Sequence, residues 1–339
     1  MKLIPLLTLL TCASVTLSAH GAPTVDDLAK FVAGLPVKDA ALAEKEKDSQ
    51  WTNYSAELNK KWAKMDDRQL THVRAWARGN SEISHVSGTV YYMFSGPDFL
   101  YARTFFPNAS TYILCGTEPV GSVPDISKMP QNYINADLEN VRHSLDSMLT
   151  THYFITKDMR VDLTRGTIAG TLPLLFVFLE KSGCTVNNVS FSGPSVQIDF
   201  HSPSGKSQTL YYFKTDISNG GGDGSFLAFC KRHGPGVSIL KSASYLMHTE
   251  SFSTIRNFLL ANSTLIVQDD SGIPFRAFDQ RRWNVKLYGI YDGVLPLFHE
   301  YFQPDLANAY QKSKAGDLGF AFGYAWQVPK GVLIEAAPK

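Results

Sequence analysis

Three short polar clusters in this sequence each follow a stretch that has the pattern of a buried β-strand. They are Ser95-Gly96-Pro97-Asp98 after residues 89–94, Thr117-Glu118 after residues 112–116, and Asp269-Asp270-Ser271-Gly272 after residues 264–267. In open α/β sheets, ligands bind at the carboxyl ends of the strands, where loops lead into helices. If the three strands are parallel neighbours, four carboxylates meet at one rim, and we expect a functional site there.

Carboxylates at such a rim can transfer protons or bind a cation. Asp98 and Asp270 are candidate catalytic acids or bases. Asp269 and Asp270 are candidate metal ligands, because adjacent carboxylates can hold a hard divalent cation through their oxygens; they could instead be plain turn formers. His248, at the start of a segment that leads toward residues 264–267, is a candidate general base, with a capping or surface role as the alternative.

Ser95 is a further catalytic candidate, because a turn between a strand and a helix is where the nucleophile of many hydrolases lies. The surrounding residues do not form the Gly-x-Ser-x-Gly pattern that this arrangement requires. Ser95 could instead cap the helix that we expect over residues 99–106. Both interpretations place Ser95 at the carboxyl end of the first strand.

Residues 89–116 have the outline of a dinucleotide-binding unit: a strand, a turn with glycine, a helix, a second strand and an acidic residue. Gly96 and Glu118 are therefore candidate cofactor-binding residues. The turn holds one glycine where the dinucleotide fingerprint has three, so the pattern predicts a fold rather than a cofactor. A divalent cation remains a candidate ligand, and a nucleotide cofactor is not expected.

The rest of the chain alternates between helical and strand patterns. Residues 136–149 and the very apolar residues 167–182 favour helices, residues 185–191 a strand, and residues 196–213 a hairpin. Residues 237–240, 264–267 and 283–291 have strand patterns, and residues 242–248 have a helical pattern. We expect an α/β fold with a mostly parallel, mixed, Rossmann-like sheet flanked by helices, in a domain spanning residues 85–330. Residues 22–84 form an N-terminal helical segment.

The first 21 residues have the features of a cleavable secretory signal. Lys2 provides a positive start, residues 3–10 are apolar, and small residues precede a cut after Gly21, or alternatively after Ala19. Cys12 suggests a lipoprotein signal, but Thr11 stands where a small residue is required. The sequence therefore predicts a periplasmic or secreted protein.

Composition narrows the classes of partner. The chain has 32 basic and 31 acidic residues, and removing Lys2 balances them, so a nucleic-acid partner is not expected. No apolar run after the signal reaches the length of a transmembrane helix. Three cysteines would remain after cleavage, Cys115, Cys184 and Cys230, and their apolar surroundings favour buried thiols over a disulfide.

Several strings together resemble a family of exported bacterial proteins of uncharacterised activity. They are Phe94-Ser-Gly-Pro-Asp-Phe-Leu-Tyr-Ala102, Phe105-Phe-Pro-Asn-Ala109, Glu118-Pro119, Lys241-Ser-Ala-Ser-Tyr-Leu-Met-His248 and Gln268-Asp-Asp-Ser-Gly-Ile-Pro274. The resemblance covers most of residues 85–325. It implies that these strings belong to one fold and assigns no role to any residue.

Three functions fit these patterns. The leading expectation is a hydrolase that uses the strand-end carboxylates on a small-molecule or cell-envelope substrate. The first alternative is a non-catalytic cell-envelope binding protein, in which aromatic residues such as Tyr91, Tyr92, Tyr101 and Trp283 line a groove. The second alternative is a degenerate nucleotide- or methyl-donor-binding fold.

Overall fold

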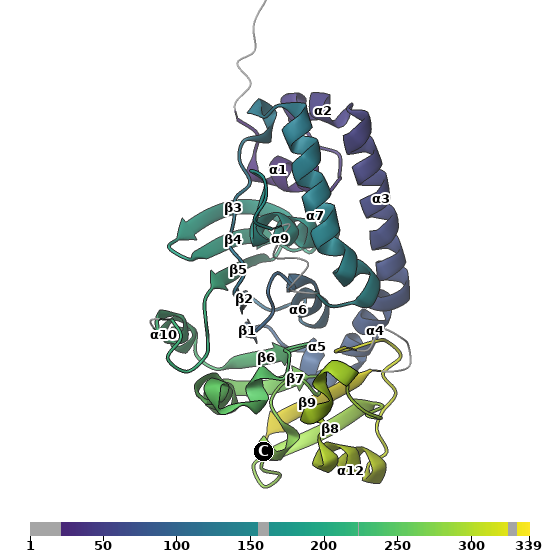
Figure 1. Ribbon diagram of the computed structural model, residues 1–339, viewed down its shortest axis with the longest axis vertical. Helices are drawn as coiled ribbons and strands as arrows, with labels where there is room; N and C mark the ends of the chain where they lie inside the picture. Colours follow the sequence, from purple (N-terminus) through teal and green to yellow (C-terminus); the bar gives the residue numbers. More distant parts are fainter. Residues whose placement is uncertain (1–21, 155–162, 223, 325–330) are drawn as a thin grey trace, which may run out of the picture.

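A nine-stranded mixed sheet forms the middle layer of the protein in the computed structural model (Figure 1), which describes residues 22–154, 163–222, 224–324 and 331–339. The strand order is β3-β4-β5-β2-β1-β6-β7-β9-β8. The strands are β1 (Thr89–Tyr92), β2 (Thr111–Gly116), β3 (Thr185–Ser192), β4 (Ser195–His201), β5 (Ser207–Lys214), β6 (Gly236–Leu240), β7 (Ser263–Gln268), β8 (Trp283–Gly289) and β9 (Val332–Pro338).

Helices cover both faces of this sheet. The α-helices are α1 (Val25–Val32), α2 (Ala40–Glu46), α3 (Ser49–Met65), α4 (Thr71–Gly79), α5 (Ser81–Ser84), α6 (Phe99–Phe105), α7 (Gln131–Thr151), α9 (Thr171–Lys181), α10 (Ser225–Arg232), α11 (Ser253–Asn262) and α12 (Pro304–Lys312). A π-helical turn, η1 (Asp66–Leu70), joins α3 to α4. Short 3₁₀ turns are η2 (Ile126–Lys128), η3 (Leu246–His248), η4 (Glu250–Phe252), η5 (Phe275–Ala277) and η6 (Pro296–Tyr301).

The five central strands are parallel, and both edges of the sheet are antiparallel. Strand β1 pairs with β2 on one side and β6 on the other, while β5 extends the sheet beyond β2 and β7 extends it beyond β6. The order β5-β2-β1-β6-β7 is that of a doubly wound sheet, in which the chain changes direction at β1. The expected mixed, Rossmann-like α/β fold is confirmed.

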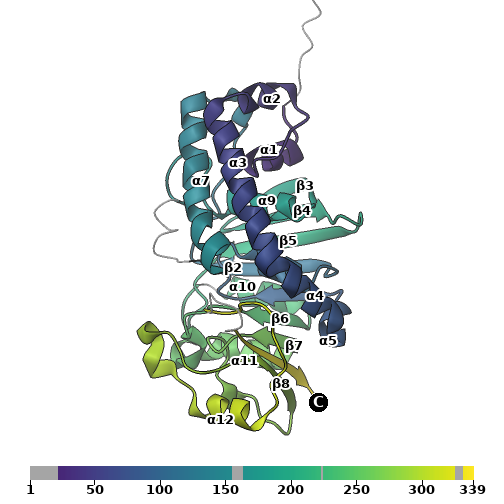
Figure 2. The same ribbon diagram turned by 90° about the vertical axis from the view of Figure 1, so that its right-hand side faces the viewer.

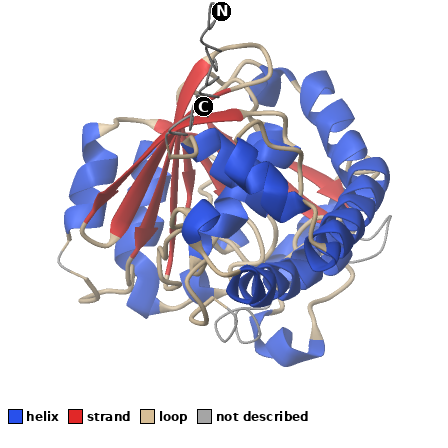
Figure 3. Cartoon of the chain, turned by 90° about the horizontal axis from the view of Figure 1, so that it is seen from above, coloured by secondary structure: helices blue, strands red, loops and turns tan. Residues whose placement is uncertain are grey.

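Side-chain alternation along the strands divides the core into two layers. In β1, Val90 and Tyr92 join the cluster under α3, α6, α7 and α9, whereas Tyr91 joins the cluster under α10 and α11. This division follows because successive side chains of a strand point to opposite faces. Figure 3 shows helices on both sides of the twisted sheet. All three residues are fully buried, as a covered parallel sheet requires.

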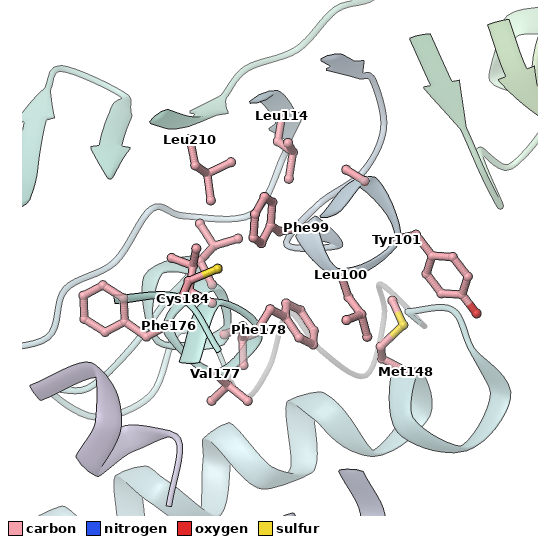
Figure 4. Close-up of a cluster of buried hydrophobic side chains, with 14 of the residues drawn as sticks. Phe99, Leu100, Tyr101, Leu114, Met148, Phe176, Val177, Phe178, Cys184 and Leu210 are labelled. Atoms are coloured by element: carbon pink, nitrogen blue, oxygen red, sulfur yellow. The ribbon is translucent and has the colours of Figure 1, made fainter. Parts of the chain in front are cut away.

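The helix α9 lies at the centre of the larger core layer. Its residues Thr171–Glu180 are all buried, which confirms the buried helix expected from the apolar sequence. Figure 4 shows Phe176, Val177 and Phe178 of α9 grouped with Phe99 and Leu100 of α6 beneath the strands. The N-terminal helices cover this layer, with α3 and α7 side by side (Figures 1 and 2).

The C-terminal strand β9 was not predicted from the sequence. It lies between β7 and β8 and is antiparallel to both, beyond the expected domain boundary at residue 330. Its apolar stretch is short, so its local pattern alone gives little signal. Two other expectations were wrong in detail. Residues 242–248 form a tight turn and the short η3 rather than a helix, and Asp98, not Ser95, caps α6.

Several expectations concern cysteines and export. Cys115, Cys184 and Cys230 are buried free thiols. The expected signal peptide (residues 1–21, with Cys12) and most of the loop or short strand expected over residues 157–163 lie outside the described residues. Within the described part of the chain, no helix is long and apolar enough to cross a membrane.

Gln69 ties the N-terminal helices to the rest of the protein. Its side-chain amide donates to the hydroxyl of Tyr101 at 2.8 Å and to the carbonyl of Ala321, and it accepts from the Ala321 amide at 3.1 Å. Gln69 is 1% exposed, so water cannot replace these partners. The amide therefore joins η1, α6 and the C-terminal segment in one buried network.

Replacing Gln69 by Leu should lower the free energy of unfolding by roughly 2–4 kcal/mol, because two buried backbone groups of Ala321 lose their partners. Urea unfolding followed by circular dichroism measures this change. The matched control is Gln50→Leu at an exposed position of α3, where we expect a change within about 0.5 kcal/mol. Equal effects of the two substitutions would contradict the buried network.

Candidate functional site

A cavity of about 410 Å³ opens at the carboxyl ends of β1, β2, β5 and β6. It is also lined by residues just beyond α7, Tyr153 and Phe154. Strands β1 and β6 are the pair at which the order of the parallel sheet reverses, and a crevice forms at such a point because the neighbouring loops turn to opposite faces. The cavity therefore lies where doubly wound folds bind their ligands.

A buried ion pair lies beside this cavity, between the residues that follow β1 and β6. The Lys241 ammonium is 3.4 Å from Oδ2 of Asp98, and the two side chains are only 1% and 4% exposed. Lys241 also donates to the carbonyl of His152, just after α7, and lies 4.1 Å from the centre of the Tyr101 ring. Burial lowers the pKa of Lys241, while the carboxylates of Asp98 and Asp269 act in the opposite direction.

Asp98 has two further partners, one on each neighbouring element. Its Oδ2 accepts a hydrogen bond from the Tyr92 hydroxyl at 2.8 Å, and its Oδ1 accepts from the Tyr101 amide at 3.2 Å, which caps α6. In dinucleotide-binding folds, the ligand's phosphates lie against the start of the equivalent helix. A carboxylate already occupies that position here, and its charge disfavours a phosphate.

The backbone around the cavity is strained. Among the described residues, five non-glycine residues have left-handed φ angles: Phe94, His152, Ser242, Ser244 and Tyr245, with values between 52° and 72°. Three of them line the cavity, and His152 provides the carbonyl that binds Lys241. Such conformations are costly for residues other than glycine, asparagine or aspartate, and they concentrate at functional sites.

The Asp269 carboxylate stabilises the strained turn after β6 from a position outside the cavity. Its carboxylate accepts from the Ser242 amide at 2.9 Å and from the Ser271 amide at 3.0 Å, and the Ser271 hydroxyl in turn accepts from the Ala243 amide at 2.7 Å. Asp269 is fully buried and does not line the cavity. The Oγ of Ser242 is buried and has no hydrogen-bond partner among the described residues.

The loops after β1 and β2 approach closely at the cavity. A Cβ on Gly116 would lie 2.9 Å from the Cα of Gly96 and 2.3 Å from Oε2 of Glu118, so only glycine fits there. Ser95 lines the cavity, and its hydroxyl donates to the carbonyls of Gly96 at 3.0 Å and Cys115 at 3.3 Å. The structure thus brings Ser95, Gly96, Asp98 and Glu118 together, as the sequence suggested.

Asp270 and His248 lie outside this cavity. The sheet order explains the separation, because β6 lies between β1 and β7. The Asp270 carboxylate accepts from the Tyr245 hydroxyl at 2.6 Å, and Asp270 lines a separate hollow with Tyr245 and Tyr324. The His248 ring packs against Tyr245 and Tyr301, and burial lowers its pKa to about 4, so the ring is uncharged near neutral pH.

The candidate cation ligands, Asp269 and Asp270, are both engaged within the protein. Their oxygens accept hydrogen bonds from Ser242, Ser271 and Tyr245. Across the residues that the structure describes, no three His, Cys, Asp or Glu side chains are grouped to hold a metal ion. A cation here would need backbone carbonyls or water as further ligands, and this site stays a prediction.

Aromatic side chains form the apolar part of the cavity. Phe94 and Phe252 are in edge-to-face contact, with ring centres 5.5 Å apart, and Tyr153 and Phe154 also contribute. Of the aromatic residues expected to line a groove, Tyr92 lines this cavity, whereas Tyr91, Tyr101 and Trp283 do not. The cavity can therefore hold a ligand with both an apolar part and polar groups.

Lys241 is the site residue that sequence reasoning missed. It follows β6 directly, and a charged residue at the end of a buried strand is the signal that could have singled it out. Ser242, Ser244 and the segment 215–217 after β5 also line the cavity and were not predicted as site residues. Their positions depend on β6 lying beside β1, which the local pattern does not reveal.

Comparisons with known proteins leave the function to be inferred from this geometry. No protein-family model matches the sequence, and no curated protein matches it. The resemblance to exported bacterial proteins therefore stays an expectation.

The buried pair of acids gives a pH prediction. Burial, followed by the charge of Asp269, raises the pKa of Asp270 to about 7. In the unfolded chain this carboxyl ionises near its usual value of 3.8. Between about pH 4 and pH 7 the folded state therefore holds a proton that the unfolded state has lost, so stability from this group falls as pH rises.

Asp270→Asn should flatten the fall in unfolding free energy across this range, by up to about 1.4 kcal/mol per pH unit. Asparagine keeps an oxygen that can accept from Tyr245. Urea unfolding at several pH values between 4 and 7 measures the slope. Asp279→Asn is the control, because hydrogen bonding to Arg281 lowers the pKa of Asp279 to about 2, below the range tested. An unchanged slope in Asp270→Asn would refute the raised pKa.

Proposed function

We propose that this protein is an exported hydrolase that binds a small, partly apolar substrate in the cavity at the carboxyl ends of β1, β2, β5 and β6. The observation that carries the proposal is the Asp98–Lys241 ion pair, which lies beside the cavity at the point where the strand order reverses. Charged groups in a cleft at this place in the fold are candidates for acid–base catalysis.

The energetics of the pair favour a functional role over a structural one. Removing two charges from water costs several kcal/mol per ion, and mutual attraction often fails to recover that cost. Apolar side chains of similar size would commonly stabilise such a position at least as well. A buried pair beside a cavity is therefore better explained by chemistry at that cavity than by stability.

The two side chains provide complementary roles for hydrolysis. The Asp98 carboxylate accepts a proton from a water molecule as the water attacks the substrate, and the Lys241 ammonium donates a proton to the leaving group. Water is consumed, one bond of the substrate is cleaved, and both residues have changed protonation state. A proton then passes from Asp98 to Lys241 over their 3.4 Å contact and restores the starting state.

Export enters the proposal through the first residues of the chain. Lys2, the apolar residues 3–10 and the small residues before Ala22 support secretion by a cleavable signal. Soluble nucleotide cofactors are expected mainly in the cytoplasm, and the carboxylate of Asp98 disfavours a phosphate at the start of α6. A small-molecule or cell-envelope substrate is therefore favoured over a nucleotide or methyl-donor ligand.

A non-catalytic binding protein is the second candidate. Its support is the aromatic wall made by Phe94, Tyr153, Phe154 and Phe252, which would hold an apolar ligand without any proton transfer. Under this alternative, Asp98 and Lys241 only fix the loops around the cavity. The two candidates differ in whether bound ligand is turned over.

A panel of chromogenic esters, phosphate esters and glycosides tests the first candidate. We expect the wild-type protein to turn over at least one class. Asp98→Asn and Lys241→Met should each lower kcat/KM for that substrate by 100-fold or more, because each removes one partner of the proton transfer. Asparagine retains an oxygen that can cap α6, and Lys241, whose pKa burial already lowers, can lose its proton, so Asp98→Asn should stay folded at reduced stability.

The control breaks an ion pair elsewhere. Lys286→Met removes the 3.1 Å contact between Lys286 of β8 and Glu335 of β9 and should leave kcat/KM unchanged. Circular dichroism of every variant confirms folding. Wild-type activity that survives in Asp98→Asn would rule out the proposed roles. Ligand binding without turnover of any class, weakened by Phe252→Ala, would favour the binding protein instead.

A further inference from the structure

A second cavity, of about 310 Å³, lies at the other end of the parallel strands from the first cavity. It is bordered by α3 and α4 on one side and by the ends of α6 and α9 on the other. Pro107 and Pro203, which also line it, precede β2 and β5, so the cavity is at the amino ends of these strands. It shares no lining residue with the first cavity.

The walls of this second cavity combine apolar surface with positive charge. Trp62, Leu70, Leu100 and Phe105 contribute apolar surface. The charged lining residues are Arg74, Arg78, Arg103, Lys181 and a single acid, Asp66. Four cations therefore face one carboxylate around a largely apolar hollow.

The single acid is already paired. Asp66 accepts two hydrogen bonds from Arg74, at 2.8 and 3.0 Å. Within the described part of the chain, neither Arg78, Arg103 nor Lys181 forms an ion pair with an acidic side chain at 4.0 Å or less. Three cations thus face the cavity without a carboxylate partner.

Two of these cations are partly or fully buried. Arg103 is 7% exposed and donates to the carbonyl of Pro107, and Lys181 donates to the side-chain oxygen of Asn59. Burial lowers the pKa of Lys181 to about 8. The neighbouring Glu180 does not neutralise it near pH 7, because burial raises the pKa of Glu180 to about 9. An anion bound here would compensate charges that the fold leaves uncompensated.

We propose that this cavity binds an amphiphilic carboxylate of the fatty-acid type. The carboxylate lies among Arg78, Arg103 and Lys181, and the alkyl chain lies against Trp62, Leu100 and Phe105. Charge complementarity defines the head group, and the largely apolar wall defines the tail. The proposal is independent of hydrolysis at the first cavity, because the two sites share no residue.

Isothermal titration with hexanoate, octanoate and decanoate tests the site. We expect one decanoate bound per chain, with affinity that rises about fourfold for each buried methylene group until the cavity is filled. Decyltrimethylammonium, which has the same chain length and the opposite charge, should not bind at this site. If the ammonium compound binds as tightly as decanoate, the proposed head-group site is wrong.

Two variants locate the binding. Lys181→Met and Arg78→Glu should each weaken decanoate binding tenfold or more, whereas Lys60→Met, at an exposed position of α3 outside the cavity, should not change it. Unchanged binding in both cavity variants would overturn the proposal. Loss of decanoate binding in Phe252→Ala, with full binding in Lys181→Met, would place the ligand in the first cavity and overturn it as well. Circular dichroism establishes that each variant is folded.

Discussion

The arrangement of the loops at the carboxyl ends of the parallel strands depends on the ion pair between Asp98 and Lys241. Leaving either charge unpaired would be costly in a place that is at most 4% exposed. The fold therefore supplies a hydroxyl from β1, an amide and an aromatic ring from α6, and a carbonyl after α7. The first three groups come from the neighbouring β1 and α6, whereas His152 follows α7 and Lys241 follows β6, so the pair requires distant parts of the chain to be assembled.

The strained backbone after β6 begins directly beside the buried Lys241. Lys241 follows β6 directly, and the chain then turns sharply through Ser242 and Ser244 in left-handed conformations. Asp269, at the end of β7, holds this turn by accepting from the Ser242 amide. Asp269, at the end of β7, thus fixes the loop that follows the neighbouring strand β6. Asp98, also an acid at the end of a parallel strand, instead pairs with Lys241 beside the cavity.

The sequence predicted what depends on local pattern. Strands β1 and β2, the helix between them, the hairpin of β4 and β5 and the buried α9 all follow from the periodicity of apolar residues. The position of β6 beside β1 does not, because strand order is set by contacts between distant segments. Asp98 and Glu118 line the same cavity, as expected. Asp270 does not, because β6 lies between β1 and the strand β7 that Asp270 follows.

Whole-chain charge conceals how the charges are arranged. The 32 basic and 31 acidic residues nearly cancel, which argues against a nucleic-acid surface. At the amino ends of the strands, however, four cations and one acid line a cavity, while at the carboxyl ends Lys241 lines another cavity with three acids, Asp98, Glu118 and Asp216. A balanced composition therefore coexists with one cavity in which acids outnumber bases and another in which bases outnumber acids. Pro107 and Pro203, which precede β2 and β5, line one cavity, and Gly116 and Thr215, at the carboxyl ends of the same two strands, line the other, so the two cavities lie at opposite ends of β2 and β5.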